Sequence, residues 1–238
     1  MLFSIITVSY NNKEHINKTL KSLLMQTYDD YELIIVDANS TDGSKEEFEL
    51  WKHKFKNYVF ISEPDEGIYD AMNKGVKKST GEYIYFLNLG DLFFNNDVLA
   101  KVAEYINLRR LDFYYGDIVW GQDIKKQPSY LSFLYFLNEH MICHQSVFAK
   151  KVLLESLPFD LRFKVCADRD WMIRSLRAGA SYKKMNIIIA YYNTDGLSSN
   201  YKNYDIDSLN ATEKNFGICG VWFVKVKRLI GKLIGKKH

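Results

Sequence analysis

Asparagine, aspartate and glycine follow four hydrophobic, strand-like stretches within the first 91 residues, and each stretch ends in a short polar segment. The four segments are Ser9–Asn12, Asp37–Ser40, Glu63–Gly67 and Asn88–Asp91. Any one of them suits an ordinary turn, because Asn, Asp and Gly are turn-forming residues. Four in succession favour the alternative, a polar ligand site in which carboxylates and amides share one edge of a sheet.

Strand-like and helix-like patterns alternate around these segments through the first half of the chain. This alternation predicts an α/β fold with parallel strands and helices on both faces of the sheet. Ligands of such sheets bind at the carboxyl ends of the strands, where the four polar segments lie. The expected strands are Leu2–Tyr10, Tyr31–Ala38, Tyr58–Ser62 and Glu82–Asn88, and the expected helices are Lys13–Met25, Ser40–Phe55, Ile68–Lys78 and Asp97–Ile106.

The second half of the chain is less regular. Strands are expected at Leu111–Trp120 and Ser181–Tyr192, with a helix from Asp168 to Ala178 between them. A loop-rich aromatic stretch precedes that helix. These features predict a mixed sheet rather than a fully parallel one.

Composition narrows the class of protein. Hydrophobic residues make up 47% of the 238 residues, which is enough for a packed core and excludes global disorder. Three well-separated cysteines form no CxxC pair, so a zinc site or a disulfide framework is not expected, and a reducing compartment fits. No apolar run reaches the length of a membrane span, and the N-terminus lacks the pattern of a signal peptide.

The order and spacing of the motifs resemble glycosyltransferase family 2, whose members have the GT-A fold. The resemblance covers roughly Leu2 to Ser199 and rests on several segments taken together. These are "SIITVSYNN", "LLMQTYDDYELIIVDANSTDGS", "EPDEGIYDAMNKG", "GEYIYFLNLGD", "HQSVFAKK" and "ADRDWMIR". The resemblance implies a Rossmann-like mixed sheet in a glycosyltransferase domain over residues 1–200, followed by a helical extension over residues 201–238.

The resemblance also implies an activity. Family members transfer a sugar from a nucleotide sugar to an acceptor hydroxyl, usually with inversion and with a divalent metal. For this chain we expect a UDP-sugar donor, a hexosyl or N-acetylhexosaminyl group, and a glycan or lipid-linked acceptor in bacterial surface polysaccharide synthesis.

The family pattern assigns donor binding to residues in the four polar segments and the helix that follows the third. Asp37 is expected at the base or ribose; its alternative role is to cap the next helix. Lys74 is a candidate phosphate contact, because Met72 stands where the family often has arginine; an exposed helical lysine is the alternative. The donor-binding candidates are Thr7, Tyr10, Asn11, Asp37, Asp65, Lys74 and Asn88.

Asp91 is the expected metal ligand. It takes the last position of the family's D-x-D motif, in which Asn88 stands where the family often has an acid and Gly90 replaces another residue of the motif. Mn²⁺ and Mg²⁺ prefer oxygen ligands and usually keep phosphate oxygens and waters as well. One or two protein carboxylates can therefore suffice when the donor diphosphate also binds the metal.

Asp168 is the expected catalytic base, because "ADRDW" matches the family's acidic motif at a helix start. Inversion requires a group that takes the proton of the acceptor hydroxyl. Asp170 is the second candidate, and both acids would also favour a helix N-terminus electrostatically. His144 and Gln145 are expected near the diphosphate or the acceptor. Aromatic residues suited to the acceptor sugar, or simply to the core, are Trp120, Tyr130, Phe133, Tyr135 and Phe136.

The C-terminal segment has a charge of +6 without any acid between Val221 and His238, whereas the rest of the chain carries −3, the difference between the net charge of +3 and this +6. An apolar side is predicted from Trp222, Phe223, Val226, Ile230, Leu233 and Ile234, and a cationic side from Lys225, Arg228, Lys232 and Lys236. This pattern is typical of a helix on an anionic membrane surface, and a helix docked on the domain is the alternative. We expect a cytoplasmic protein at the inner face of the membrane that does not bind nucleic acid.

Two other classes compete with the enzyme. The first is a non-catalytic nucleotide-sugar-binding or scaffold protein on the same fold, which the altered D-x-D motif favours. The second is a nucleotidyltransferase, but "VSYNNKEH" lacks the Gly-rich basic loop that such a protein requires after its first strand.

Overall fold

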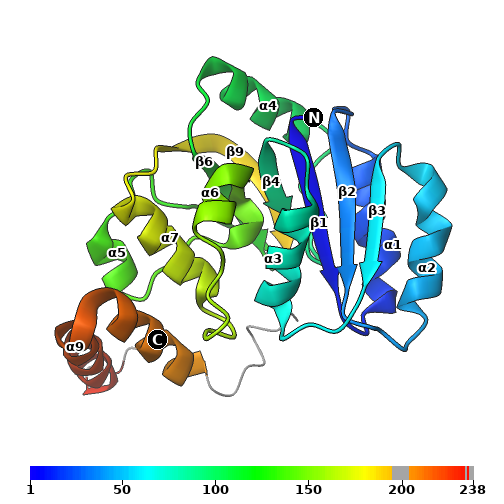
Figure 1. Cartoon of the computed structure of the whole chain (residues 1–238). Coiled ribbons are helices and arrows are strands. Elements are labelled where there is room, and N and C mark those ends of the chain that lie inside the picture. Colours follow the sequence, from blue (N-terminus) through cyan, green and yellow to red (C-terminus); the bar gives the residue numbers. More distant parts are fainter. Residues whose placement is uncertain (195–203, 234, 236–238) are drawn as a thin grey trace.

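A computed structural model describes residues 1–194, 204–233 and 235 (Figure 1). One sheet of nine strands forms the centre, in the order β3-β2-β1-β4-β8-β6-β9-β5, with β7 paired to β6. The strands are β1 (Phe3–Ser9), β2 (Tyr31–Asp37), β3 (Tyr58–Ser62), β4 (Tyr83–Phe86), β5 (Leu92–Phe93), β6 (Phe113–Trp120), β7 (Asp123–Lys125), β8 (Val147–Lys150) and β9 (Tyr182–Tyr192).

The sheet is mixed, as the sequence predicted. β1 pairs in parallel with β2 and β4, and β2 with β3, which makes the four N-terminal strands parallel. β8 is antiparallel to both β4 and β6, so it joins the parallel half to the β6–β9 pair. The strands β5, β7 and β8 were not predicted, because each is two to four residues long and shows no clear alternation of its own.

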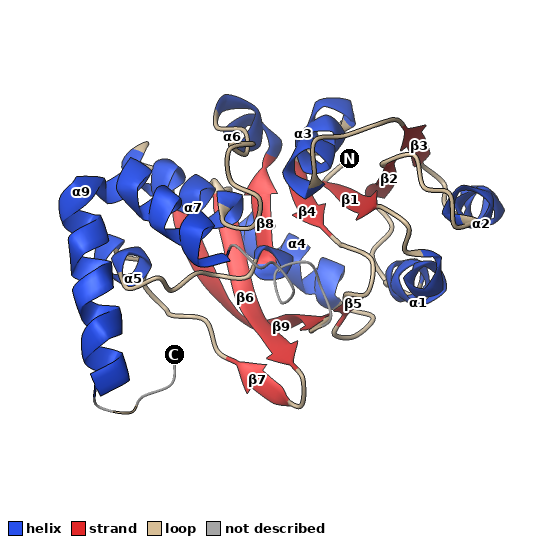
Figure 2. Ribbon diagram, turned by 90° about the horizontal axis from the view of Figure 1, so that it is seen from below, coloured by secondary structure: helices blue, strands red, loops and turns tan. Residues whose placement is uncertain are grey.

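Helices cover both faces of the sheet (Figure 2). α1, α2 and α4 bury apolar side chains such as Leu20, Phe48 and Leu99 in one core layer. α3, α6, α7 and the first part of α9 contribute to the opposite layer, for example through Met72 and Trp171. The helical segments are α1 (Lys13–Leu24), α2 (Ser44–Trp51), η1 (Lys52–Lys54), α3 (Ile68–Lys78), α4 (Val98–Leu108), α5 (Phe133–Leu137), η2 (His144–Ser146), α6 (Lys151–Ser156), α7 (Ala167–Arg177) and α9 (Tyr204–Leu233).

The C-terminal helix is longer than its amphipathic pattern indicated. α9 begins at Tyr204, and Gly217, with φ of 67° and ψ of −173°, divides it into two arms. Figures 1 and 2 both place α9 on the opposite side of the molecule from β3. The expected domain boundary at residue 200, and the tail residues Ile234 and Lys236, lie outside the described residues. Within residues 1–194, 204–233 and 235, no helix is both long and apolar enough to cross a membrane.

Candidate active site

The polar segments after β1 and β2 lie side by side, because Ser9 pairs with Asp37 in the parallel ladder and Asp37 pairs with Ser62 of β3. Asp37 is fully buried. Its carboxylate accepts hydrogen bonds from the Ser40 amide at 2.9 Å and the Ser62 hydroxyl at 2.8 Å. Asp37 does not cap α2, whose N-cap position is Gly43. Its contacts therefore fix the loop after β2 against the end of β3. These strand ends belong to the edge of the sheet at which we expect the sugar donor to bind, called the donor edge below.

The segment after β1 is held in a bent conformation. Asn11 has φ of 46°. Its amide donates to the Ser40 hydroxyl at 2.8 Å, and its side-chain oxygen accepts from the Thr41 amide at 2.8 Å. Thr7 is buried and donates to the Leu87 carbonyl at 2.8 Å, which ties β1 to the end of β4. Tyr10 is 68% exposed, so its ring is accessible to a ligand.

Asp65 and Lys74 lie in and just after the segment that follows β3. Asp65 accepts a hydrogen bond from the Gly67 amide at 2.9 Å, and burial raises the pKa of this carboxyl. Lys74 donates to the Pro64 carbonyl at 2.6 Å and forms ion pairs with Asp70 at 3.1 Å and Glu63 at 3.3 Å. The charge of Lys74 is thus balanced by acids of its own segment, and its contact with a phosphate stays a prediction.

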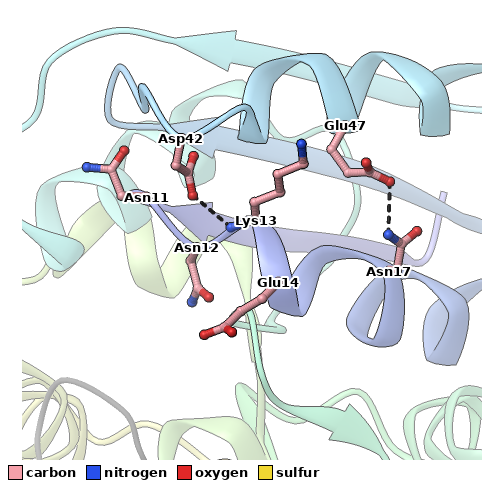
Figure 3. A pocket seen from close by; sticks show the side chains of 7 residues that line it. All are labelled: Asn11, Asn12, Lys13, Glu14, Asn17, Asp42 and Glu47. Atoms are coloured by element: carbon pink, nitrogen blue, oxygen red, sulfur yellow. Dashed lines mark hydrogen bonds between the residues drawn. The ribbon is translucent and has the colours of Figure 1, made fainter.

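A polar hollow of about 470 Å³ opens beside Asn11, between the first turns of α1 and α2 (Figure 3). The Asp42 carboxylate accepts from the Lys13 amide at 2.9 Å, and Asn17 donates to Glu47 at 2.9 Å. Its lining comprises Asn11, Asn12, Lys13, Glu14, Asn17, Asp42 and Glu47. Of the predicted site residues only Asn11 lines it, so this hollow borders the donor edge and does not contain Asp37 or Asp91.

Asp91 lies behind the end of β4 and is 3% exposed. Its Oδ1 accepts from the Asn193 amide at 2.8 Å. Burial raises the pKa of Asp91 to about 6, against the lowering effects of the Asn193 amide, His144 and the Gln145 side chain. Gly90 has φ of +100°, and a Cβ there would lie 2.2 Å from the Asn193 Nδ2 atom. The motif thus requires glycine before Asp91 for both conformation and space.

Three predicted residues from distant segments form a hydrogen-bonded chain. Asn88 Nδ2 lies 2.8 Å from His144 Nε2, and His144 Nδ1 lies 3.2 Å from Asp168 Oδ2. Asp168 is in the first turn of α7, is 2% exposed, and accepts the Arg169 amide at 2.8 Å through Oδ1. Because the segment after β4 supplies Asn88 and α7 supplies Asp168, His144 of η2 bridges the donor edge and the candidate base.

Gln145 joins the same cluster. Its carbonyl accepts from the Tyr85 hydroxyl at 2.7 Å, and its side chain hydrogen-bonds Asp91. Phe136 is fully buried and belongs to the core, whereas Tyr130 is 72% exposed. Of the aromatic candidates, Tyr130 is therefore available to an acceptor and Phe136 is not.

Asp170 lies apart from this chain. It is fully buried, and its carboxylate accepts from Arg174 Nε at 2.7 Å, Lys214 Nζ at 2.9 Å and Asn215 Nδ2 at 2.8 Å. Every one of these partners lies in α7 or α9. The geometry makes Asp170 a structural anchor between two helices and leaves Asp168 as the acid beside His144.

The sequence predicts that Asp91 binds a divalent cation, which needs oxygen ligands. Among the described residues, no group of three His, Cys, Asp or Glu side chains could hold a metal alone. Asp91 still offers a carboxylate, and Asn88 Oδ1 is a buried oxygen without a hydrogen-bond partner in the described part of the chain. Mg²⁺ and Mn²⁺ commonly complete their coordination with substrate phosphates and water. These two oxygen ligands therefore fit a cation that binds together with a diphosphate.

Comparison with known proteins identifies the family of this chain. The family model for glycosyl transferase family 2 matches residues 4–166, and the chain belongs to this family. A PGL/p-HBAD biosynthesis glycosyltransferase of Mycobacterium bovis (strain BCG / Pasteur 1173P2) is 32% identical over 203 residues, 84% of this chain and 79% of that protein. A Bacillus subtilis (strain 168) protein named as a teichuronic acid biosynthesis glycosyltransferase, TuaG, is 34% identical over 124 residues, 51% of this chain and 49% of that protein.

Solved structures show the same fold. S. aureus TarS 1-349 in complex with UDP-GlcNAc has a TM-score of 0.75 and 18% identity, over 91% of this chain and 68% of that chain. The mannosyltransferase PcManGT from Pyrobaculum calidifontis, in complex with GDP-Man and Mn²⁺, has a TM-score of 0.68 and 18% identity, over 91% of this chain and 63% of that chain. The predicted GT-A fold with a C-terminal helix is therefore confirmed, and the protein is a glycosyltransferase.

Sequence reasoning missed one residue of this cluster. Asn193 follows the last strand, β9, and its amide holds Asp91. The signal that identified the other segments was present here too, because "YYNTDG" is a polar segment directly after a hydrophobic strand. The fifth such segment was not connected to the first four because β9 is far from them in sequence.

Proposed function

We propose that this glycosyltransferase transfers a hexosyl or N-acetylhexosaminyl group, with inversion, from a UDP-sugar to a hydroxyl of a glycan or lipid-linked acceptor in bacterial surface polysaccharide synthesis. The observation that carries the proposal is the continuous chain from Asn88 through His144 to Asp168. It links the donor edge to a buried carboxylate. The relatives support the pathway, since their names refer to PGL/p-HBAD biosynthesis and to teichuronic acid biosynthesis.

Asp168 takes the proton of the acceptor hydroxyl while that oxygen forms a bond to the anomeric carbon and the bond from this carbon to the diphosphate breaks. UDP leaves on the opposite face of the sugar. Asp91 is the residue that would hold Mn²⁺ or Mg²⁺, which neutralises charge on the leaving diphosphate when it is bound. Asp37, Thr7 and Asn11 fix the loops against which the nucleotide binds.

The test separates binding from chemistry. Asp168→Asn keeps the size of the side chain but cannot accept the proton, so we expect unchanged affinity for the UDP-sugar and turnover lowered about a hundredfold or more. Calorimetry with Mn²⁺ and a transfer assay with the same UDP-sugar measure the two effects. Donor binding without transfer to any glycan or lipid-linked acceptor by the unmodified protein would favour the non-catalytic alternative.

An anionic membrane surface is the partner we propose for the second arm of α9. Val221 and Val224 face the body and are buried, whereas Lys225 and Lys232 are exposed. The outward apolar side chains are between 43% and 65% exposed and comprise Ile218, Trp222, Phe223, Val226, Leu229 and Ile230. Such a mixed apolar and cationic face suits a lipid–water interface, where each cation contributes about 1 kcal/mol. The proposed location is the cytoplasmic face of the cell membrane.

The structure changes one detail of the predicted cationic side. Arg228 turns toward the body, where it forms an ion pair with Glu139, and it forms a second ion pair at 3.3 Å with Asp205 of the first arm of α9. Lys227 likewise donates to the Asn138 carbonyl at 2.8 Å. These contacts dock the arm on the body while its outer side stays exposed, so the docked side and the proposed membrane-facing side are opposite sides of one helix.

Vesicle binding tests this proposal without removing the helix. We expect the double variant Trp222→Ser/Ile230→Ser to lose binding to phosphatidylserine vesicles, because both side chains are more than half exposed and contribute little to the core. Thermal unfolding of the variant should match that of the parent protein. Unchanged sedimentation with vesicles, at an unchanged salt dependence, would contradict membrane docking.

A further inference from the structure

We infer that His144 is a positioning residue that sets the amide of Asn88, with its own ring orientation dictated by Asp168. The effect of His144 on donor binding rests on the proposed function. The arrangement of Asp168, His144 and Asn88 does not depend on that function. The starting point is the order of contacts: carboxylate, imidazole, amide, with separations of 3.2 Å and 2.8 Å.

The hydrogen on the imidazole follows from its neighbours. A carboxylate can only accept hydrogen bonds, so the Nδ1 atom that faces Asp168 carries the hydrogen. In the neutral ring Nε2 is then an acceptor. Nε2 faces Asn88, and only the NH₂ group of that amide can donate to it. Asp168 therefore selects the Nδ1–H tautomer, and the tautomer selects the amide orientation.

The other end of the amide explains why this matters. With the NH₂ group on His144, Asn88 Oδ1 is left buried and without a partner in the described part of the chain. A buried acceptor without a partner is unfavourable, so it is a site prepared for an electropositive group of an incoming ligand. If the Asn88 side-chain amide flipped, its NH₂ group would take the place of Oδ1, and this hydrogen-bond acceptor would be lost. His144 thus holds an acceptor toward the nucleotide sugar.

The burial of Asp168 supports the same arrangement. Its side chain is 3% exposed, whereas that of His144 is 17% exposed. Asp168 Oδ1 is fixed by the Arg169 amide, and Arg169 itself is fixed by the Phe136 carbonyl at 2.6 Å and the Thr212 hydroxyl at 3.1 Å. The carboxylate is therefore rigidly placed before any ligand binds, and it can impose the tautomer on His144.

The first experiment measures the tautomer directly. The protein contains five histidines, so ¹⁵N-histidine labelling gives a small spectrum, in which the signals missing from His144→Phe identify His144. At a pH where the ring is neutral we expect the hydrogen on Nδ1, and on Nε2 after Asp168→Leu. Asp168→Asn retains a carbonyl acceptor and should restore the Nδ1–H form. A wild-type His144 with its hydrogen on Nε2 would overturn the inference, whatever the protein's activity.

The second experiment measures the consequence. Calorimetric affinity for a UDP-sugar with Mn²⁺ should fall about threefold to tenfold in His144→Phe and in Asp168→Leu, the equivalent of one hydrogen bond. The double variant should lose no more than either single one, because both changes interrupt the same chain. The matched control is His140→Phe, at an exposed histidine just before η2 whose ring contacts Tyr135 at a tilt. Additive losses, or equal losses in the control, would overturn the coupling; absence of donor binding in the parent protein would instead refute the proposed function.

Discussion

Replacing Asp91 with asparagine should stabilise the metal-free protein while abolishing metal-dependent donor binding. Burial raises the pKa of Asp91 to about 6, despite the hydrogen bonds from Asn193 and Gln145. The folded protein therefore holds this carboxylate in an environment that disfavours its charge. Asparagine keeps the oxygen that accepts the Asn193 amide, and Gln145 can turn its own amide to meet the new NH₂ group.

The magnitude follows from proton linkage. A carboxyl with a raised folded-state pKa binds more protons in the folded than in the unfolded state, so the free energy of unfolding falls as the pH rises between the two pKa values. With an ordinary value near 4 and a folded value of about 6, the loss by neutral pH amounts to about 3 kcal/mol. Asp91→Asn removes this penalty, and the difference between the two proteins should vanish near pH 4.

Urea unfolding with a chelator at pH 4, 6 and 7.5 would measure this window, and calorimetry of UDP with and without Mn²⁺ would measure binding. The matched control is Asp112→Asn. Although burial opposes it, hydrogen bonds from Ser181 and Lys150 lower the pKa of Asp112, so that substitution should destabilise the protein at pH 7.5. Equal stability of Asp91→Asn and the parent at every pH would refute the electrostatic reasoning. Retained Mn²⁺-dependent UDP binding would refute the metal assignment.

Two further substitutions test the surroundings of the site. Asp170→Asn should lower the free energy of unfolding by about 2 kcal/mol, because it weakens buried hydrogen bonds to the charged Arg174 and Lys214. Thermal unfolding would show this loss. A loss of turnover at unchanged stability would mean that Asp170 acts in the chemistry. Gly90→Ala should cost at least about 1 kcal/mol, because φ is +100° and the Asn193 side chain occupies the space; UDP–Mn²⁺ affinity should fall with it, and an unchanged affinity would show that the loop adapts.

The gathering of the polar segments at one edge of the sheet could be predicted from the sequence because its information is local. Each of the first four strands is a hydrophobic run that ends on a polar segment, and parallel pairing brings those ends together without further assumptions. Asp37 illustrates this, because its burial at the end of β2 follows from the hydrophobic residues that precede it in the strand. What the sequence did not show is that its carboxylate would be occupied by Ser40 and Ser62.

The distant contacts could not be predicted in the same way. From the sequence, Lys74 was a candidate to bind a phosphate. In the structure its ammonium group forms ion pairs with Glu63 and Asp70. Asp170 stands two residues from Asp168, and only the packing of α9 onto α7 shows that the two acids have different partners. The hydrogen bonds of Asp168 with His144 and of Asp170 with Asn215 join residues 24 and 45 positions apart, and no local pattern records them.

The dependence of α7 on α9 has a consequence for the order of folding. Buried Arg169 takes partners from Ser208 and Thr212, and Asp170 takes one from Asn215, so α7 cannot reach its final environment before the chain through residue 215 has been synthesised. Asp37, Asn11 and their hydrogen-bond partners lie within the first 62 residues and need no such delay, whereas Asp91 waits for Asn193. During translation, the edge formed by β1, β2 and β3 can therefore settle first, and Asp168, the proposed base, is set in place among the last steps.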